Sequence, residues 1–342
     1  MNSTVLIDSI QNEQSRSQYF IRILGEILVA TVLLYVVSRY LIYWQDWPDL
    51  TQSIQTLIGS NETPENPNLF KSIALLMGYF SILILSIIHV SKTPNTTLTE
   101  AADQYRNLVF YIIRFAFWAV FLVGLADTII SLLRVENFLL PLVGEKLNDT
   151  LGLATKRGLY VHYPLIVISL VIAWFSRSLG FIWLAFLVVL AEFTIVITRF
   201  IFSYEQAYMG DLVRFWYAAL FLFASAYTLY DNGHVRVDVL YARFKPRKKA
   251  WVNALGTLLL GLPLCWTILH YGMGSKQSSL ISPILTFEVS QSGYGLYVKY
   301  LMGGFLIVYA VTMAIQFVSL FLSSCAYLLD EKDAPIPAGG EH

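Results

Sequence analysis

Long apolar runs separated by short polar segments make up most of the chain. Eight of these runs are long enough for a membrane-spanning helix, which needs roughly 20 mostly apolar residues. The runs are continuous and do not alternate apolar with polar positions, so the strands of a membrane barrel are not expected. We therefore predict an all-α, polytopic helical bundle whose spans cover residues 20–43, 69–91, 108–133, 159–176, 179–202, 215–230, 250–271 and 297–326.

Two segments between predicted spans are too apolar for free loops. Residues 203–213 and 280–294 mix aromatic and aliphatic residues with a few acids. Each is predicted either as an amphipathic helix lying at the outer membrane interface or as a half-buried loop. Residues 61–67 and the end of the chain are rich in proline, asparagine or glycine and are predicted to be flexible.

The predicted spans suggest three parts. Residues 1–178 form an N-terminal membrane extension of about four spans, residues 179–330 a four-helix module, and residues 331–342 a flexible tail. No basic cluster precedes a short apolar core in the first 18 residues, so a cleaved signal peptide is not expected.

The composition supports a membrane protein. The chain is 56% hydrophobic and only 13% charged, about half the charged share of soluble domains. Lys plus Arg and Asp plus Glu both number 23, which gives no basic excess for nucleic acid. Cys265 and Cys325 lie in apolar runs and are predicted to be packing residues. The sequence has no phosphate-binding loop, zinc motif or nucleophile elbow, so we predict neither an enzyme nor a bound cofactor or metal.

Basic residues between spans predict the orientation, because cytoplasmic loops are enriched in them. Six of the 14 residues in 236–249 are Lys or Arg, which predicts a cytoplasmic loop and places both termini in the cytoplasm. The segment 134–158 opposes this assignment, since it falls on the predicted outer side and carries Arg134, Lys146, Lys156 and Arg157.

Two predicted spans contain a similar stretch with an acid inside it. Residues 121–134 and 186–199 are identical at seven of 14 positions, and Asp127 and Glu192 occupy the same place in each. An arginine follows seven residues later on the same helical face, Arg134 or Arg199, roughly 10 Å along the axis. This separation is too long for a tight bridge, so we expect a partner helix to supply the counter-charge and the arginine to reach the headgroups. Partial duplication and chance similarity both stay open.

The buried charges leave alternative functions open. A clamp between helices is the favoured role of Asp127 and Glu192, and a self-sufficient carrier using them as an ion or proton relay is the alternative. His162 and His270 are expected at matching depth near the outer ends of their spans. Paired imidazoles of this kind would suit a haem- or quinone-binding anchor of a respiratory complex.

The second half of the chain contains an ordered set of motifs. One helix ends in an Arg-aromatic pair, an acidic stretch follows, and the next helix opens with arginine and aromatic residues. A Gly-His-hydrophobic-Arg-hydrophobic-Asp turn and a basic loop come after it. This order resembles the small permease subunit of TRAP (tripartite ATP-independent periplasmic) transporters over roughly residues 179–329. The matching residues are Arg199, Asp211, Arg214, His234, Arg236 and Asp238.

The chain departs from that family in three places. Gly210-Asp211 stands where the family has paired acids, and Ala224-Ser225-Ala226 replaces its usual mid-helix glycine. The ordinary four-helix subunit also lacks a counterpart of residues 1–178.

The resemblance implies a scaffold subunit in the bacterial inner membrane that braces a large permease. A periplasmic substrate-binding protein would deliver an organic anion, and an ion gradient, as in sodium symport, would drive uptake. The implied partners are that permease, the binding protein and membrane lipids, with no nucleic acid. Partner-interface or structural roles are assigned to Asp127, Arg134, Glu192, Arg199, Asp211, Arg214, His234, Arg236 and Asp238.

Overall fold

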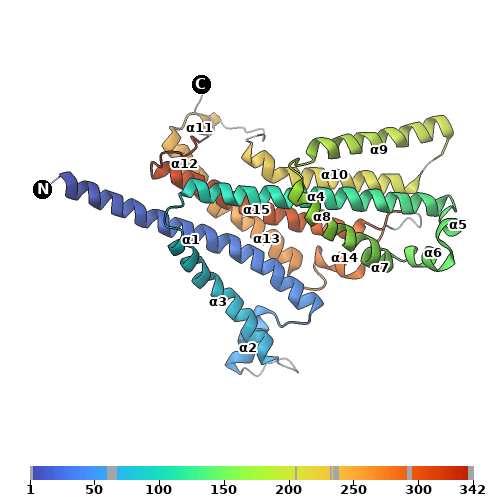
Figure 1. Cartoon of the computed structure of the whole chain (residues 1–342), viewed down its shortest axis with the longest axis horizontal. Coiled ribbons are helices and arrows are strands. Elements are labelled where there is room, and N and C mark those ends of the chain that lie inside the picture. The colour runs from blue at the N-terminus through green and yellow to red at the C-terminus, as the bar shows by residue number, and fades with distance from the viewer. Residues whose placement is uncertain are drawn as a thin grey trace. The chain divides into compact units, whose positions relative to one another are not determined.

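The computed structural model describes residues 3–59, 68–204, 206–231, 233, 239–290 and 295–337. These residues form helices joined by turns, and no strand occurs among them (Figure 1), so the predicted all-α fold is confirmed. The longer elements are α1 (Ser3–Trp44), α3 (Leu69–Lys92), α4 (Leu98–Val135), α8 (Tyr163–Phe175), α9 (Phe181–Phe202), α10 (Ala207–Tyr230), α12 (Pro246–Gly256), α13 (Leu262–Met273) and α15 (Lys299–Leu328). The shorter ones are α2 (Leu50–Ile58), α5 (Leu139–Val143), α6 (Glu145–Leu151), α7 (Ala154–Arg157), α11 (Val239–Ala242), α14 (Ile281–Thr286) and the π-helical turns η1 (Gly158–His162) and η2 (Thr257–Gly261).

Eight helical stretches of the described chain are long and apolar enough to cross a membrane, which is the number predicted. They are Arg16–Trp44, Leu69–Lys92, Leu98–Val135, Ala154–Phe175, Phe181–Phe202, Tyr208–Tyr230, Pro246–Met273 and Lys299–Leu328. The third stretch extends well beyond the predicted 108–133, because helix-forming polar residues continue it towards its N-terminus. Most of the side chains in the fifth stretch, α9, are exposed.

Two of the spans contain a π-helical turn, and each turn ends two residues before a proline. Turn η1 precedes Pro164, and turn η2 precedes Pro263. Proline has no N–H group, and its ring clashes with the carbonyl four residues earlier. The wider π-helical turn accommodates both effects while the helix continues.

The interfacial segments differ from their predictions. Residues 203, 204 and 206 lie in the connection between α9 and α10, and residues 207–213 are the first two turns of α10, so the helical part of the predicted 203–213 segment belongs to a span. The 280–294 segment contains one short helix, α14, and residues 291–294 lie outside the described chain. Helix α2 was not predicted. Asp49 caps it with a reciprocal capping box to Gln52, and Gly59 ends it in the left-handed region at φ 70°.

The chain divides into two compact units that are discontinuous in sequence. Unit 1 comprises Met1–Arg106, Val235–Leu264 and Ala314–His342, and unit 2 comprises Asn107–His234 and Cys265–Met313. The division into residues 1–178, 179–330 and 331–342 stays a prediction. Residues 61–67 lie outside the described chain, and residues 331–337 of the tail form turns and irregular structure.

In unit 1, α1 and α2 both pack on α3. Arg22 is 8% exposed, and its two terminal nitrogens donate to the carbonyl and the hydroxyl oxygen of Thr93, each at 2.7 Å. Its charged end is therefore satisfied at the C-terminus of α3, where the last carbonyls of a helix lack intrahelical partners.

Glu331 holds the start of α4 in the same unit. Its Oε1 accepts from the Leu98 N–H at 2.9 Å, and its Oε2 accepts from the N–H and the hydroxyl of Thr99 at 3.2 and 3.0 Å. Gln18 donates to the same carboxylate at 3.1 Å. A residue more than 200 positions away thus caps this helix, and its negative charge suits the positive end of the helix dipole.

Unit 2 has an aromatic core between α4, α9, α10 and the first half of α15. Phe215, Ala219 and Phe223 line the buried face of α10, against Phe117 of α4 and Phe305 of α15. Gly124 permits a close approach of α4 and α10, because a Cβ atom there would lie 2.6 Å from the indole nitrogen of Trp216. Helix α9 lies alongside α10 in Figure 1.

We predict that Glu331→Ala destabilises unit 1 by about 1 kcal/mol, the usual value of a lost helix cap. The variant leaves the first N–H groups of α4 without their acceptor. Thermal unfolding of the chain in detergent measures the change. Asp333→Ala is the matched control, since Asp333 is exposed two residues away and caps no helix. Equal midpoints for the two variants would contradict the prediction.

Candidate functional site

An ion pair lies fully buried in unit 2. Asp127 of α4 and Arg157 of α7 are both 0% exposed, and Arg157 Nη1 donates to Asp127 Oδ1 at 2.8 Å. The same nitrogen lies 3.2 Å from the Ser131 hydroxyl, and Arg157 Nε donates to the Leu151 carbonyl at 2.7 Å. The partner helix expected to supply a counter-charge to Asp127 is therefore α7.

His162 and two tyrosines complete the arrangement, which we call the Asp127 cluster: Asp127, Arg157, His162, Tyr297 and Tyr300. His162 Nε2 lies 3.2 Å from Asp127 Oδ1, and its Nδ1 lies 3.0 Å from the Tyr300 hydroxyl. An ionised carboxylate only accepts hydrogen bonds, so His162 Nε2 carries a proton and donates to Asp127. The Tyr297 N–H donates to Asp127 Oδ2 at 2.7 Å.

Local sequence places these groups. Arg157 is the last residue of α7, and the π-helical turn η1 follows it directly. His162 is the last residue of η1, and its side chain lies in the interior. Gly158 opens that turn because a side chain does not fit. A Cβ atom there would lie 2.5 Å from the Phe287 ring and 3.0 Å from the Tyr300 hydroxyl. The ring of Tyr297 lies 4.1 Å below the Arg157 guanidinium, a cation–π contact.

The Asp127 cluster can hold helices together. Both oxygens of Asp127 accept hydrogen bonds, and the charges of Asp127 and Arg157 cancel. The bonds join α4, α7, η1 and the start of α15. Removing one member of such a buried pair leaves an uncompensated charge, which makes the remaining group strongly destabilising.

Arg134 also bonds within unit 2. It donates through Nη1 to the Tyr297 hydroxyl at 2.5 Å, and that hydroxyl donates to the Gly152 carbonyl at 3.1 Å. The guanidinium thus contacts the Asp127 cluster through Tyr297, whereas the sequence predicted that it reaches the headgroups.

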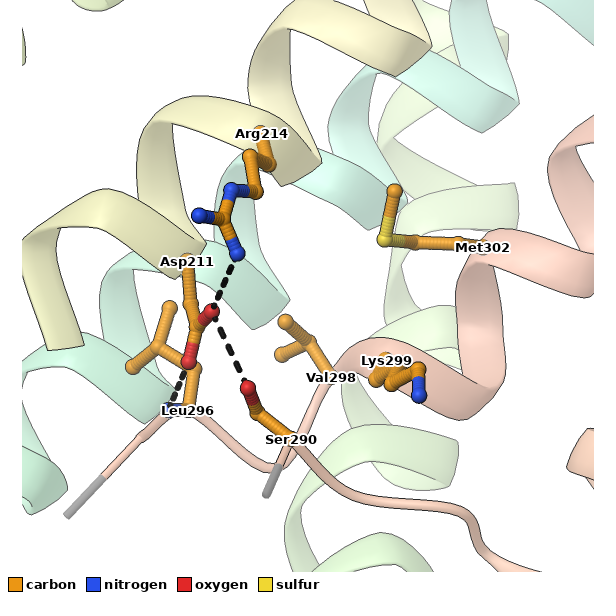
Figure 2. A pocket seen from close by; sticks show the side chains of 7 residues that line it. All are labelled: Asp211, Arg214, Ser290, Leu296, Val298, Lys299 and Met302. Carbon is orange, nitrogen blue, oxygen red and sulfur yellow. Dashed lines mark hydrogen bonds and ion pairs between the residues drawn. The ribbon is translucent and has the colours of Figure 1, made fainter. Parts of the chain in front are cut away.

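A second polar group surrounds Asp211 at the N-terminal ends of α10 and α15 (Figure 2). Asp211 accepts from the Ser290 hydroxyl and from the Leu296 N–H, each at 3.2 Å, and Arg214 Nη1 lies 3.6 Å away. These residues line a cavity of about 420 Å³ together with Val298, Lys299 and Met302. Asp211 therefore ties the start of α10 to the segment before α15.

Glu192 and Arg199 occupy a different environment. Both are exposed on α9, and no described residue forms a hydrogen bond or ion pair with either side chain. The sequence places Glu192 in register with Asp127, yet the structure brings no counter-charge to it. His234, Arg236 and Asp238 lie outside the described residues.

Sequence reasoning missed the residues that surround Asp127. Arg157 was noted only as a basic residue on the wrong side of the membrane, and His162 only as a possible haem ligand. One signal in the sequence could have identified Arg157. It is a basic residue on the predicted outer side of the membrane, and a basic residue that contradicts the predicted orientation is a candidate for burial in an ion pair. His162 and His270 do not form a matched pair of buried histidines, because His162 is 0% exposed and His270 is exposed.

Comparison with known families places the second half of the chain. Residues 185–325 match the model described as Tripartite ATP-independent periplasmic transporters, DctQ component. This part of the chain is similar to the small permease subunits of TRAP transporters. It begins at α9 and includes Glu192, Arg199, Asp211 and Arg214, as the resemblance implied, whereas Asp127 and Arg157 precede it. The comparisons with curated proteins and with solved structures gave no match.

The match has consequences for the class of protein. Components of this family belong to transporters, are not enzymes, and work with a large TRAP permease and a binding protein. With eight apolar helices in its described part, the chain is a multi-pass membrane protein, and its second half is similar to TRAP small permeases. Residues 1–178 lie outside the match.

We predict that Asp127→Asn destabilises the chain by about 3–5 kcal/mol, because the buried Arg157 then has no counter-charge. The double variant Asp127→Leu/Arg157→Leu removes both charges and should recover most of the loss. Thermal unfolding in detergent, followed by tryptophan fluorescence, gives the values for a double-mutant cycle.

The control for this cycle is Asp103→Asn. It breaks the partly exposed pair in which Arg106 Nη1 lies 2.8 Å from Asp103 Oδ1, and such pairs contribute only about 0.2–1 kcal/mol. Additive effects of the two leucine substitutions would show that Asp127 and Arg157 are not coupled.

Proposed function

We propose that this chain is the small membrane subunit of a TRAP-type secondary transporter and that it braces the large permease in the bacterial inner membrane. In this proposal a periplasmic binding protein delivers an organic anion, and an ion gradient, such as that of sodium, drives its uptake through the permease. The match of residues 185–325 to the family is the observation that carries the proposal.

The interior of unit 2 suits a brace better than a carrier. A carrier binds its solute at polar groups that are free to receive it, usually where helices are broken. Asp127 and Arg157 are instead bound to each other, and His162 has partners at both ring nitrogens. These contacts fix helices relative to one another, and Arg157 Nη2 is the atom of this ion pair that has no hydrogen-bond partner among the described residues.

Two cavities of unit 2 fit the same view. The cavity of about 420 Å³ beside Asp211 is lined by the first turns of α10 and α15, at the ends of two spans. The other has about 130 Å³ and is lined by apolar residues such as Phe115, Phe223 and Phe305. Neither combines a central position in the spans with free charged groups.

The alternative functions have weaker support. Haem ligation by His162 would require the loss of its bond to Asp127 or to Tyr300. A relay between Asp127 and Glu192 lacks a path in these contacts, since Asp127 is enclosed and Glu192 is exposed on α9. The bracing role requires neither the loss of a His162 hydrogen bond nor a path between Asp127 and Glu192.

Affinity purification of the chain from detergent-solubilised membranes of its source should recover a large polytopic permease and a periplasmic solute receptor. Vesicles with the chain alone should take up no organic anion, whereas adding the permease and the receptor should give uptake driven by an imposed ion gradient. Vesicles with the permease and the receptor but without this chain are the control. Full uptake by the chain alone, or recovery of redox subunits together with a Soret band, would overturn the proposal.

A further inference from the structure

Helix α9 is attached to unit 2 along one narrow face. Leu184 and Ala191 are its buried residues, and α10 is the helix on which it packs. Most of the remaining surface is apolar and exposed, for example Ile182 at 85% and Val189 at 65%. In lipid such a surface is compatible with either acyl chains or another protein, so its apolar residues alone do not identify what covers it.

Glu192 is the feature that distinguishes this surface. It lies about 15 Å from either end of α9, which is close to the centre of a hydrocarbon layer about 30 Å thick. Its side chain is exposed, and no described residue bonds to it. A carboxyl group at this depth is costly against lipid, and such groups normally face protein or water.

The face that carries Glu192 has the spacing of a helix-packing surface. Ala185, Glu192 and Arg199 follow one another at intervals of seven residues and lie along one side of α9. Ala185 is small, which permits close approach of another helix. Arg199 lies near the C-terminal end of α9, where a long cationic side chain reaches the headgroup level.

The geometry points to this α9 face, defined by Ala185, Glu192 and Arg199, as the docking surface for one transmembrane helix of the large permease that places a hydrogen-bond donor opposite Glu192. The donor is a cationic or hydroxyl side chain, because a carboxylate at this depth needs a proton donor or a positive charge. The identity of the partner rests on the proposed function, whereas the need for a donor follows from Glu192.

A second copy of this chain fits the surface poorly. Copies in one membrane share their orientation, so a two-fold axis between them runs along the membrane normal. Contact through the α9 face would then place the two Glu192 carboxyl groups opposite each other at the same depth. Like charges at this distance repel, and only the sharing of a proton would relieve them. A different partner with a donor avoids the conflict.

The test uses the complete transporter in its membranes. Glu192→Leu should lower the amount of large permease that co-purifies with the chain by about tenfold, which corresponds to about 1.4 kcal/mol of binding free energy. Glu192→Gln keeps an acceptor oxygen and should retain most of the recovery. Glu145→Leu, the same change at an exposed position of α6, is the matched control and should leave recovery unchanged.

A crosslinking experiment gives an independent measurement. Val189→Cys on α9 and Val171→Cys on α8 are both highly exposed and lie in predicted spans, so a photoreactive maleimide can label either site. The native Cys265 and Cys325 are buried and should contribute little background. Irradiation should attach the probe at position 189 to the large permease and give at least tenfold less of this product from position 171.

The outcomes separate the two proposals. If the unmodified chain recovers no large permease, the proposed function fails and this inference fails with it. If it recovers the permease but Glu192→Leu does so equally well and position 189 labels only lipid or a second copy of the chain, the inference alone is overturned. Glu192→Leu should also keep the unfolding midpoint of the isolated chain, because no described residue bonds to the Glu192 side chain. A lower midpoint together with no crosslink would likewise overturn the docking surface.

Discussion

The arrangement of unit 2 depends on one constraint, namely that an ionised group inside an apolar bundle must meet its counter-charge within the bundle. Asp127 lies in the interior of α4, and the bonds from Arg157, His162 and the Tyr297 N–H satisfy both of its oxygens. Lipid offers no substitute for these donors. The path of the chain from α7 through η1, and the position of the start of α15, are therefore tied to one carboxylate.

The two similar stretches show why sequence register does not determine environment. Residues 121–134 and 186–199 place an acid at the same position, yet Asp127 is 0% exposed and Glu192 is exposed. Gly124 and Val189 also occupy equivalent positions, and they differ in the same way. Gly124 lies against Trp216 of α10, whereas Val189 is 65% exposed. The same helical pattern thus has its polar partners inside unit 2 at Asp127, whereas at Glu192 it faces outward.

Much of the fold could be predicted because its main signals are local. Apolar length predicted all eight spans. Helix α2 was not predicted, although its capping box and its final glycine are visible in the sequence. A search for long apolar runs does not detect a helix of nine residues. Residues 207–213 were assigned to an interfacial segment, because their polar residues concealed the first turns of α10.

The candidate site was less predictable because its contacts join residues far apart in the chain. An acid buried in a span implies a donor, but nothing in the sequence selects Arg157, 30 positions away, over the other basic residues. The same holds for Glu331, whose partners are more than 200 positions away. Sequence therefore identified Asp127 as a residue that needed a partner, and only the fold shows that this partner is Arg157.

The structure also changes how the loop charges should be weighed. The charge rule concerns Lys and Arg that are free in short loops, since those are the residues that resist transfer across the membrane. In 134–158, Arg157 is buried in an ion pair and Arg134 bonds to Tyr297, which leaves Lys146 and Lys156 exposed. In the predicted cytoplasmic loop Lys249 is buried, and the described residues that stay exposed are Arg243, Lys245, Arg247 and Lys248. Burial thus removes one basic residue from each side of this comparison, Arg157 and Lys249, so the cytoplasmic position of both termini stays a prediction from the loop charges.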